Sequence, residues 1–460
     1  MMTYPDRPTR TRRPDAIAPT LVLVALCAAV TAPALAQVEN GNGPMAHAEQ
    51  SGMLTPPSFR FPGHMASIWT RGDLEGLHQD TYVTAPLMIH PEGFFEDGVY
   101  VWDAWPIRNP DGSVAEIDGW VVKVGLSAAW AEVEETGWDF YTISTWRYWY
   151  TRDGDWRPGG VIFERDEALG SRQWAGSTFY DPNTQQVTFY YTATGRPDAA
   201  SIEDDMPDHE ISIHNESAGR PSTEQRLAMV TATVSASADG IAFDDFGEHE
   251  IIAEADGRLY DTQGTYLASS AVYGFRDPEF LLDPHTGKEH VLFTANAAGV
   301  AGPYNGVVGL LTKSDSGEWE LEPPIIVSMG VNSQLERPHV IYRDGGAYLF
   351  FSTHDFTFGP EVHGPRGLYG FHSATGSLQG RWVPLNRHGL VAANPTEAMG
   401  QMYSFLVLPD GLVMSYLNHT YGFELDPQHD DREFYGGPGP MFRIGVDGET
   451  ATVIEAENAR

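Results

Sequence analysis

Apolar positions along this chain fall into short runs and not into helical stripes. Beyond residue 37 no stretch keeps a helical period, and β-rich runs are broken by Gly, Pro, Asn and Asp. One unit recurs: an apolar strand, a turn such as D-P or D-G, and a second apolar strand. Its five copies span residues 101–126, 178–194, 278–296, 338–354 and 404–418. The turn residues favour antiparallel hairpins, because Pro presets φ and Gly or Asn accepts a positive φ.

Five hairpins over about 400 residues predict an all-β fold, a five-bladed β-propeller with the active site in its central funnel. In this fold each blade is an antiparallel sheet, and the first strand of each blade lines the channel. One or two β-sandwiches are the alternative architecture. We expect residues 57–460 to form a single catalytic domain, with an acidic surface loop inserted at residues 197–225.

The N-terminal residues have the features of an export signal. Four arginines lie among the first 13 residues, an apolar run covers residues 17–30, and small residues precede Gln37. The run is shorter than the ~20 apolar residues that span a bilayer. We therefore expect a signal peptide at residues 1–36, cleaved near Ala36-Gln37, and a flexible arm at residues 37–56. The mature protein is predicted to be secreted, either extracellular or periplasmic.

The net charge of the chain excludes two classes of partner. Lys and Arg number 28 and Asp and Glu number 63, which gives a net charge of −35 at pH 7. Such a surface repels nucleic acid and anionic membranes, whereas an uncharged solute is indifferent to it. The single cysteine, Cys27, lies in the predicted signal, so no disulfide is expected in the mature chain. The sequence makes no prediction of oligomeric state.

Three acidic residues stand at equivalent places in the repeat. Asp103 lies in VWDAWP, Asp277 in FRDPEF and Glu336 in QLERPHV, each where the first strand of a hairpin begins. In a propeller these strands line the channel, so the three carboxylates are expected to converge. Carboxylates beside aromatic rings and arginines suit the cleavage of a glycosidic bond, in which one acts as nucleophile and another as proton donor.

The motifs VWDAWP, QWAGS, FRDPEF and ERPHV, in this order, resemble levansucrases and related bacterial fructosyltransferases, glycoside hydrolase family 68, of the Gram-negative type. The resemblance covers nearly all of the predicted mature chain and implies a five-bladed propeller. It also implies that sucrose is the donor and that fructan or oligosaccharides are the acceptors.

The resemblance assigns a role to each acidic residue. Asp103 would be the nucleophile, Glu336 the acid/base, and Asp277 the stabiliser of the oxocarbenium-like transition state. The residues that the resemblance implies for sugar binding are Trp102, Trp174, Arg276, Arg337, His354, Tyr403, Ser177 and Gln334. Among them the two tryptophans would wall the fructose subsite, and His354 would lie on the glucose and acceptor side.

Three positions depart from the pattern of the family. Its usual Trp-Ser-Gly-Ser reads Trp-Ala-Gly-Ser at residues 174–177, so that a hydroxyl near the nucleophile is missing. Thr294 stands where many members have glutamate. Ser333 stands where calcium-binding members have aspartate, which argues against a structural calcium ion. We predict no metal site and no cofactor.

Three functions remain open at this point. The first is a secreted levansucrase, which makes β-2,6 fructan or oligosaccharides and releases glucose. The second is a sucrose or fructan hydrolase (a β-fructofuranosidase) or an inulosucrase on the same fold. The third is a sugar-binding propeller without catalysis, against which the three retained acids weigh, since binding alone needs no nucleophile and proton donor.

Overall fold

The computed structural model describes residues 60–61, 64–79, 82–87, 96–199, 201–206, 221–266, 273–300, 302–420 and 433–454 of the chain. The chain divides into two compact units, residues 1–55 and 56–460, and all described residues belong to the second. The predicted signal peptide and the predicted arm at residues 37–56 lie outside the described residues. Within the described ranges no helix is both long and apolar enough to cross a membrane.

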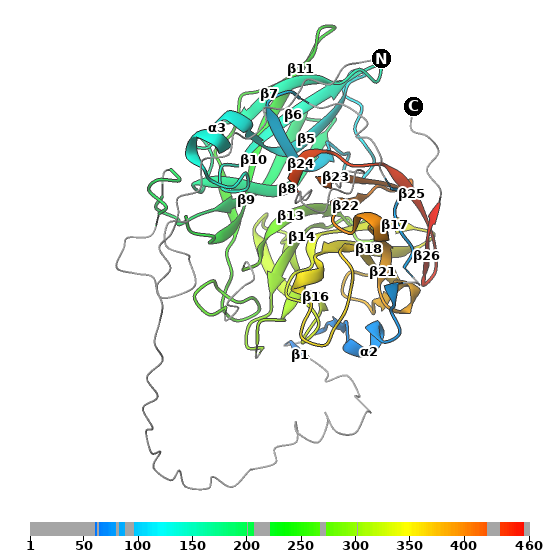
Figure 1. The fold of residues 1–460 in the computed structure, drawn as a ribbon. Helices are drawn as coiled ribbons and strands as arrows, with labels where there is room; N and C mark the ends of the chain where they lie inside the picture. Colours follow the sequence, from blue (N-terminus) through cyan, green and yellow to red (C-terminus); the bar gives the residue numbers. More distant parts are fainter. Residues whose placement is uncertain are drawn as a thin grey trace, which may run out of the picture. The chain divides into compact units, whose positions relative to one another are not determined.

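The second unit is a five-bladed β-propeller, as predicted (Figure 1). Blade I consists of β4 (Val99–Pro106), β5 (Val121–Ala129), β6 (Thr145–Thr151) and β7 (Arg157–Phe163). Blade II consists of β8 (Arg172–Asp181), β9 (Gln186–Thr194), β10 (Gln225–Ala236), β11 (Ile241–Asp244) and β12 (Glu250–Ala253). Blade III consists of β13 (Phe275–Leu282), β14 (Glu289–Asn296), β15 (Gly306–Lys313) and β16 (Trp319–Val327), and the short β3 (Ser67–Ile68) pairs with it in parallel.

The remaining two blades follow in chain order, and the colours of Figure 1 run from cyan in blade I to red in blade V. Blade IV consists of β17 (Glu336–Arg343), β18 (Gly346–Thr353), β19 (Gly367–Ser373), β20 (Val383–Pro384) and β21 (Leu390–Ala393). Blade V consists of β22 (Met402–Val407), β23 (Leu412–Thr420), β24 (Glu433–Pro438), β25 (Phe442–Asp447) and β26 (Thr450–Ile454). The ring closes where β4 packs against β22, β23 and β24.

Few other elements occur in the described part of the chain. β1 (Arg60–Phe61) and β2 (His64–Met65) form a small separate sheet. The α-helices are α2 (Arg71–Leu74) and α3 (Trp130–Thr136). The 3₁₀ turns are η2 (Asp355–Thr357), η3 (Leu385–Arg387) and η4 (Thr396–Ala398).

The five predicted hairpins are confirmed, because the first two strands of every blade pair antiparallel. The turn between β17 and β18 shows why the local sequence specifies them. Arg343 pairs with Gly346, so Asp344 and Gly345 form a two-residue loop with φ of 52° and 80°. Two positive φ values in succession match the right-handed twist of the strands, and Asp-Gly is a favoured pair for them.

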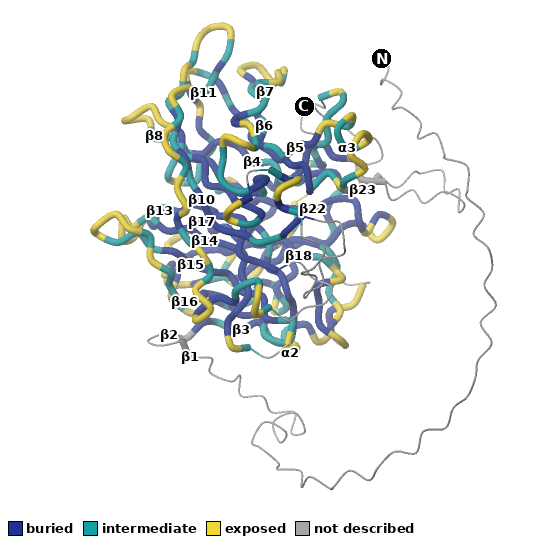
Figure 2. Tube along the Cα trace, turned by 90° about the vertical axis from the view of Figure 1, so that its left-hand side faces the viewer, coloured by how far each residue is buried: buried dark blue, intermediate teal, exposed yellow. Residues whose placement is uncertain are grey.

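Aromatic side chains fill the space between blades, and buried residues run through the middle of the unit in Figure 2. Trp105 of blade I meets Trp146 edge-on, with 4.8 Å between ring centroids, in a cluster that also takes residues from blades II and V. Trp69, just after β3, is fully buried against Phe351 and Tyr369 of blade IV. Residues 67–69 therefore contact both blade III and blade IV and help to hold the two blades together.

Candidate active site

The first strand of every blade carries a β-bulge at the same place. The register shifts lie at Trp102/Trp105, Trp174/Ser177, Arg276/Glu279, Glu336/His339 and Tyr403/Leu406. In four blades the first bulged residue has a positive φ: Asp103 at 42°, Asp277 at 61°, Arg337 at 52° and Ser404 at 57°. Residues other than glycine rarely adopt a positive φ. β-Bulges are common beside active sites, where they change the direction of a side chain.

The bulges stack two rings of five side chains in the centre of the propeller. The residues before the bulge are Trp102, Trp174, Arg276, Glu336 and Tyr403, and the first bulged residues are Asp103, Ala175, Asp277, Arg337 and Ser404. All ten line one cavity of about 350 Å³. A space of this size suits a small molecule. The predicted convergence of the three acids in the central funnel is therefore observed.

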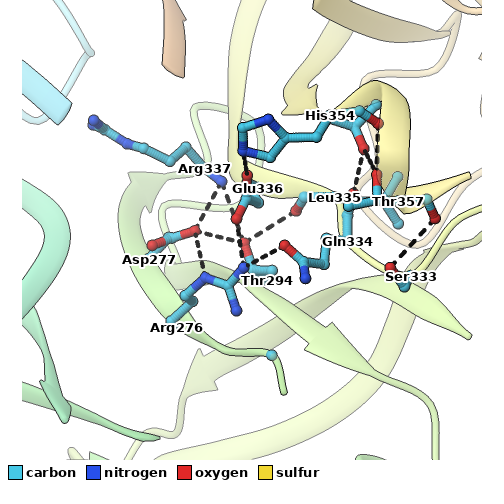
Figure 3. Close-up of polar contacts among 12 residues, drawn as sticks. Arg276, Asp277, Thr294, Ser333, Gln334, Leu335, Glu336, Arg337, His354 and Thr357 are labelled. Carbon is cyan, nitrogen blue, oxygen red and sulfur yellow. Dashed lines mark hydrogen bonds and ion pairs between the residues drawn. The ribbon is translucent and has the colours of Figure 1, made fainter. Parts of the chain in front are cut away.

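Glu336 is held by Arg276 and His354, as Figure 3 shows, and by Tyr403. Arg276 Nη2 donates to Glu336 Oε1 at 2.5 Å, and the Tyr403 hydroxyl donates to Oε2. His354 Nε2 lies 3.7 Å from the same Oε2 atom. Arg276 is itself positioned by a bond to Gln334 Oε1 at 2.9 Å. The carboxyl group of Glu336 thus has a defined orientation before any substrate binds.

Asp277 is buried and is held by two neutral hydrogen-bond donors and one nearby positive charge. Its Oδ2 accepts from Thr294 Oγ1 at 2.8 Å and from the backbone N–H of Arg337 at 3.1 Å. Arg276 Nε lies 3.7 Å from this oxygen. Burial raises the pKa of Asp277, the positive charge of Arg276 lowers it, and the negative charge of Glu336 raises it further.

Asp103 is a carboxyl group in an environment that disfavours its charge. Burial raises the pKa of Asp103 to about 6, and the negative charges of Asp277 and Glu336 act in the same direction. The positive charge of Arg337 and a hydrogen bond from Ser404 oppose this rise. The Asp103 carboxylate is consequently less solvated and more basic than a surface aspartate.

Arg337 supplies a positive charge beside Asp103 and Asp277. Its guanidinium lies 4.8 Å over the ring of Trp105, and its Nη1 donates to Ser404 Oγ at 3.1 Å. It lowers the pKa of both Asp103 and Asp277. With Trp105 fully buried beneath it, the guanidinium is fixed within the core.

One side of the cavity is an aromatic wall. Trp174 Nε1 donates to the backbone oxygen of Tyr141 at 2.9 Å, which orients the indole. Phe140 packs edge-on against Trp102 with 4.8 Å between centroids. Trp102, Trp174, Phe140 and Tyr141 all line the cavity. Flat apolar faces opposite charged groups are the arrangement that binds sugar rings.

The levansucrase/invertase family model matches residues 59–306 and 301–459 of this sequence. The chain belongs to this family, glycoside hydrolase family 68. A levansucrase of Rahnella aquatilis is 31% identical over 428 residues, which cover 84% of this chain and 94% of the relative. An extracellular sucrase of Zymomonas mobilis is 29% identical and covers 85% and 93% of the two chains.

A solved structure has the same fold. The inulosucrase from Halalkalicoccus jeotgali bound to kestose superposes with a TM-score of 0.71 at 33% identity, over 84% of this chain and 95% of that one. The resemblance drawn from the motifs and the propeller fold are both confirmed. Family 68 is a family of fructosyltransferases, and this chain carries the site described above within its fold.

Most sugar-binding residues expected of a family 68 member do line the cavity. These are Trp102, Trp174, Arg276, Arg337, His354, Tyr403 and Gln334. Ser177 is the exception, and the structure corrects its expected role. Its fully buried hydroxyl donates to Pro278 O at 2.9 Å and accepts from the Phe280 N–H at 3.1 Å. Because Ser177 follows the bulge, it ties blade II to blade III and does not face the cavity.

Sequence reasoning missed several residues of this family 68 site. Ser404 of blade V occupies the same repeat position as Asp103 and Asp277, and its hydroxyl forms a hydrogen bond with Asp103. In blade II the same position is Ala175, which has no hydroxyl. Tyr416 pairs with Tyr403 and also lines the cavity. Aligning the five hairpins would have identified both. Phe140 and Phe356 come from connections between strands, where no repeat pattern points to them.

The arrangement of the described residues offers no evident metal ligands. Among them, no group of three or more His, Cys, Asp or Glu side chains is placed to hold an ion. Ser333, at the position discussed for calcium, uses its hydroxyl to donate to Thr357 O at 3.3 Å.

Proposed function

We propose that this protein is a secreted levansucrase. It transfers the fructosyl unit of sucrose, with retention, to growing β-2,6 fructan, to fructooligosaccharides or to water, and it releases glucose. The observation that carries the proposal is the convergence of Asp103, Asp277 and Glu336 in one cavity, with Glu336 bonded by Arg276 and Tyr403.

The reaction needs two half-steps. First, the Asp103 carboxylate attacks the anomeric carbon of the fructosyl unit and the bond to the glucose oxygen breaks, while Glu336 gives its proton to that oxygen. Second, an acceptor hydroxyl attacks the same carbon, the bond to Asp103 breaks, and Glu336 takes the proton of the acceptor. Two inversions give net retention, and Asp103 ends as a free carboxylate.

Asp277 is proposed to stabilise the transition state between these steps. Its carboxylate is fixed by Thr294 and the Arg337 N–H. A preorganised negative charge gains interaction energy as positive charge develops on the fructosyl ring, without reorganising at that moment. The neutral rings of Trp102 and Trp174 are proposed to wall this subsite.

The choice of acceptor separates the proposal from its alternatives. A hydrolase would pass through the same fructosyl-enzyme and deliver it mainly to water. An inulosucrase would build β-2,1 bonds, and the 33% identity to the inulosucrase of Halalkalicoccus jeotgali supports it as the second candidate. The 31% identity to the levansucrase of Rahnella aquatilis, over most of both chains, supports β-2,6 transfer.

Secretion is part of the proposal and rests on separate support. The basic residues, apolar run and small residues before Gln37 form an export signal. The relative from Zymomonas mobilis is an extracellular sucrase. Mass analysis of the protein recovered outside the cytoplasm should find Gln37 as the first residue, and an uncleaved N-terminus would contradict the proposal.

Incubation with sucrose tests the activity. Free glucose, free fructose and ethanol-precipitable polymer are measured separately, and the linkage of the polymer is read by NMR. We expect glucose in excess of fructose and a β-2,6 polymer, with no glucose release by the Asp103→Asn variant. Equal glucose and fructose would indicate a hydrolase, a β-2,1 polymer would indicate an inulosucrase, and no glucose release would refute the proposed function.

A further inference from the structure

Phe356 is an exposed aromatic ring at the cavity that holds Glu336. Its exposed fraction of 67% is the highest among the exposed large hydrophobic side chains of the described residues, ahead of Met399 at 62%. A single exposed apolar residue is ordinary by itself. Phe356 differs from Met399 because it also lines the central cavity, beside His354 and Glu336.

Phe356 is the outer member of a stack of three rings that begins at Glu336. The Tyr403 hydroxyl donates to Glu336, and the Tyr403 ring stacks on His354 with 3.7 Å between centroids and 19° between planes. His354 stacks in turn on Phe356, at 4.6 Å and again 19°. The stack therefore leads away from the carboxyl group through which a leaving or entering sugar exchanges its proton.

The backbone that carries Phe356 is firmly anchored. Phe356 lies in η2, whose last residue Thr357 is buried and donates from Oγ1 to His354 O at 2.7 Å. The backbone oxygen of Thr357 accepts from Ser333 N at 3.0 Å, and Asp355 forms an ion pair with Arg366 at 3.4 Å. Figure 3 shows Thr357 next to His354, with Ser333 bonded to Thr357. An aromatic ring held in this way binds a ligand without first losing freedom of its own.

We propose that the exposed face of Phe356 is the platform for the second sugar unit beyond the cleaved bond, so that it selects oligosaccharides as acceptors. The proposal rests on the proposed function, because it assigns the first unit beyond that bond to the space beside His354 and Glu336. A sugar ring offers an apolar C–H face to an aromatic ring and needs no charge there. A neutral ligand also suits an acidic protein surface.

Binding to a catalytically blocked protein provides the first test. In the Asp103→Asn background, calorimetry compares kestose, which has two units beyond its terminal fructosyl, with sucrose, which has one. Adding Phe356→Ala should weaken kestose binding about three- to tenfold and sucrose binding less than about twofold. Phe356→Trp should restore kestose binding, and Met399→Ala should leave it unchanged.

Turnover provides the second test. At fixed sucrose, Phe356→Ala should raise the acceptor KM for kestose about three- to tenfold relative to that for a monosaccharide acceptor. An equal loss of affinity for kestose and sucrose, or no loss of affinity for kestose, would contradict the proposed role of Phe356. Wild-type protein that releases no glucose would refute the proposed function instead, while the calorimetric comparison would still decide the role of Phe356. Failure of Asp103→Asn to bind kestose at all would count against both.

Discussion

At the scale of single residues, the environment of Asp103 links the stability of the fold to its chemistry. Burial holds the pKa of Asp103 at about 6, above the value of about 4 expected in the unfolded chain. Between these values the folded chain binds more protons than the unfolded chain. The contribution of Asp103 to the free energy of unfolding therefore falls as pH rises from about 4 through about 6.

The Asp103→Asn variant should reverse this loss and abolish activity. Without the buried charge, the Tm at pH 7.5 should rise by roughly 1–3 °C, with no comparable rise at pH 4. Glucose release should fall by at least about 100-fold, because the covalent step is lost. Thermal unfolding at both pH values and initial rates on sucrose provide the measurements. An equal Tm change at both pH values would contradict the assigned pKa, and substantial residual turnover would contradict the covalent role.

Glu336 and Asp277 should be separable by the leaving group of the donor. Glu336→Gln cannot protonate glucose, so it should lose most activity on sucrose but recover part of it on a fructosyl donor whose leaving group needs no proton. Asp277→Asn should show no such recovery, since Asp277 acts on the transition state itself. Initial rates on both donors test this. Equal recovery in the two variants would overturn the division of roles.

At the scale of elements, hydroxyl groups on second strands fix the bulge of the next blade. Thr192, Thr294 and Ser352 lie opposite the residue before the bulge in blades II, III and IV. Their hydroxyl oxygens accept hydrogen bonds from the backbone N–H groups of Asp277, Arg337 and Phe405, with N···O distances of 2.9, 3.2 and 2.8 Å respectively. The same position holds Leu126 in blade I and Tyr416 in blade V, and both line the cavity.

The Thr294→Val variant tests whether such a hydrogen bond between blades positions the catalytic acids. Thr294 is fully buried and contacts both Asp277 Oδ2 and the Arg337 N–H. Valine keeps the shape but leaves these groups with one partner fewer, which should lower the free energy of unfolding by about 1–3 kcal/mol. It should also lower kcat on sucrose. Denaturant unfolding and kinetics measure the two effects, with Thr294→Ser as the control that keeps the hydroxyl. Equal behaviour of the valine and serine variants would show that the hydroxyl has no such role.

At the scale of the whole molecule, the excess of negative charge opposes compaction. The chain has 63 acidic and 28 basic residues. Self-repulsion of a surface with this balance destabilises the folded state and is screened by salt.

Salt should therefore stabilise the protein. Raising NaCl from about 0.01 M to about 1 M shortens the Debye length from about 30 Å to about 3 Å, so the Tm should increase steeply at first and then level off. The KM for sucrose should change little, because the substrate is uncharged. Thermal unfolding over a salt series measures the first effect and kinetics the second. A Tm that falls or stays constant would contradict the expectation.

The hairpins and the three acidic residues of the site could be predicted from local sequence alone. Strand alternation and turns such as Asp344-Gly345 are set by neighbours in the chain, so the blades could be predicted without knowing how they pack. The acids could be predicted because Asp103, Asp277 and Glu336 all lie on first strands, although the structure places Asp103 and Asp277 within a bulge and Glu336 just before one. The family resemblance placed Ser177 among the sugar-binding residues, but a shift of one or two positions past a bulge turns its side chain away from the cavity and toward blade III.

The other features of the site depend on how the blades pack together. The positive φ at Asp103, Asp277, Arg337 and Ser404 depends on packing against the next blade, which local propensity does not encode. Burial raises the pKa of Asp103, and the charges that act on it, those of Asp277, Glu336 and Arg337, belong to blades distant in sequence. The position of Phe356 over His354 depends in the same way on η2 folding back onto Ser333. Electrostatic and stacking interactions act through space, so these properties arise only when the five blades close around one cavity.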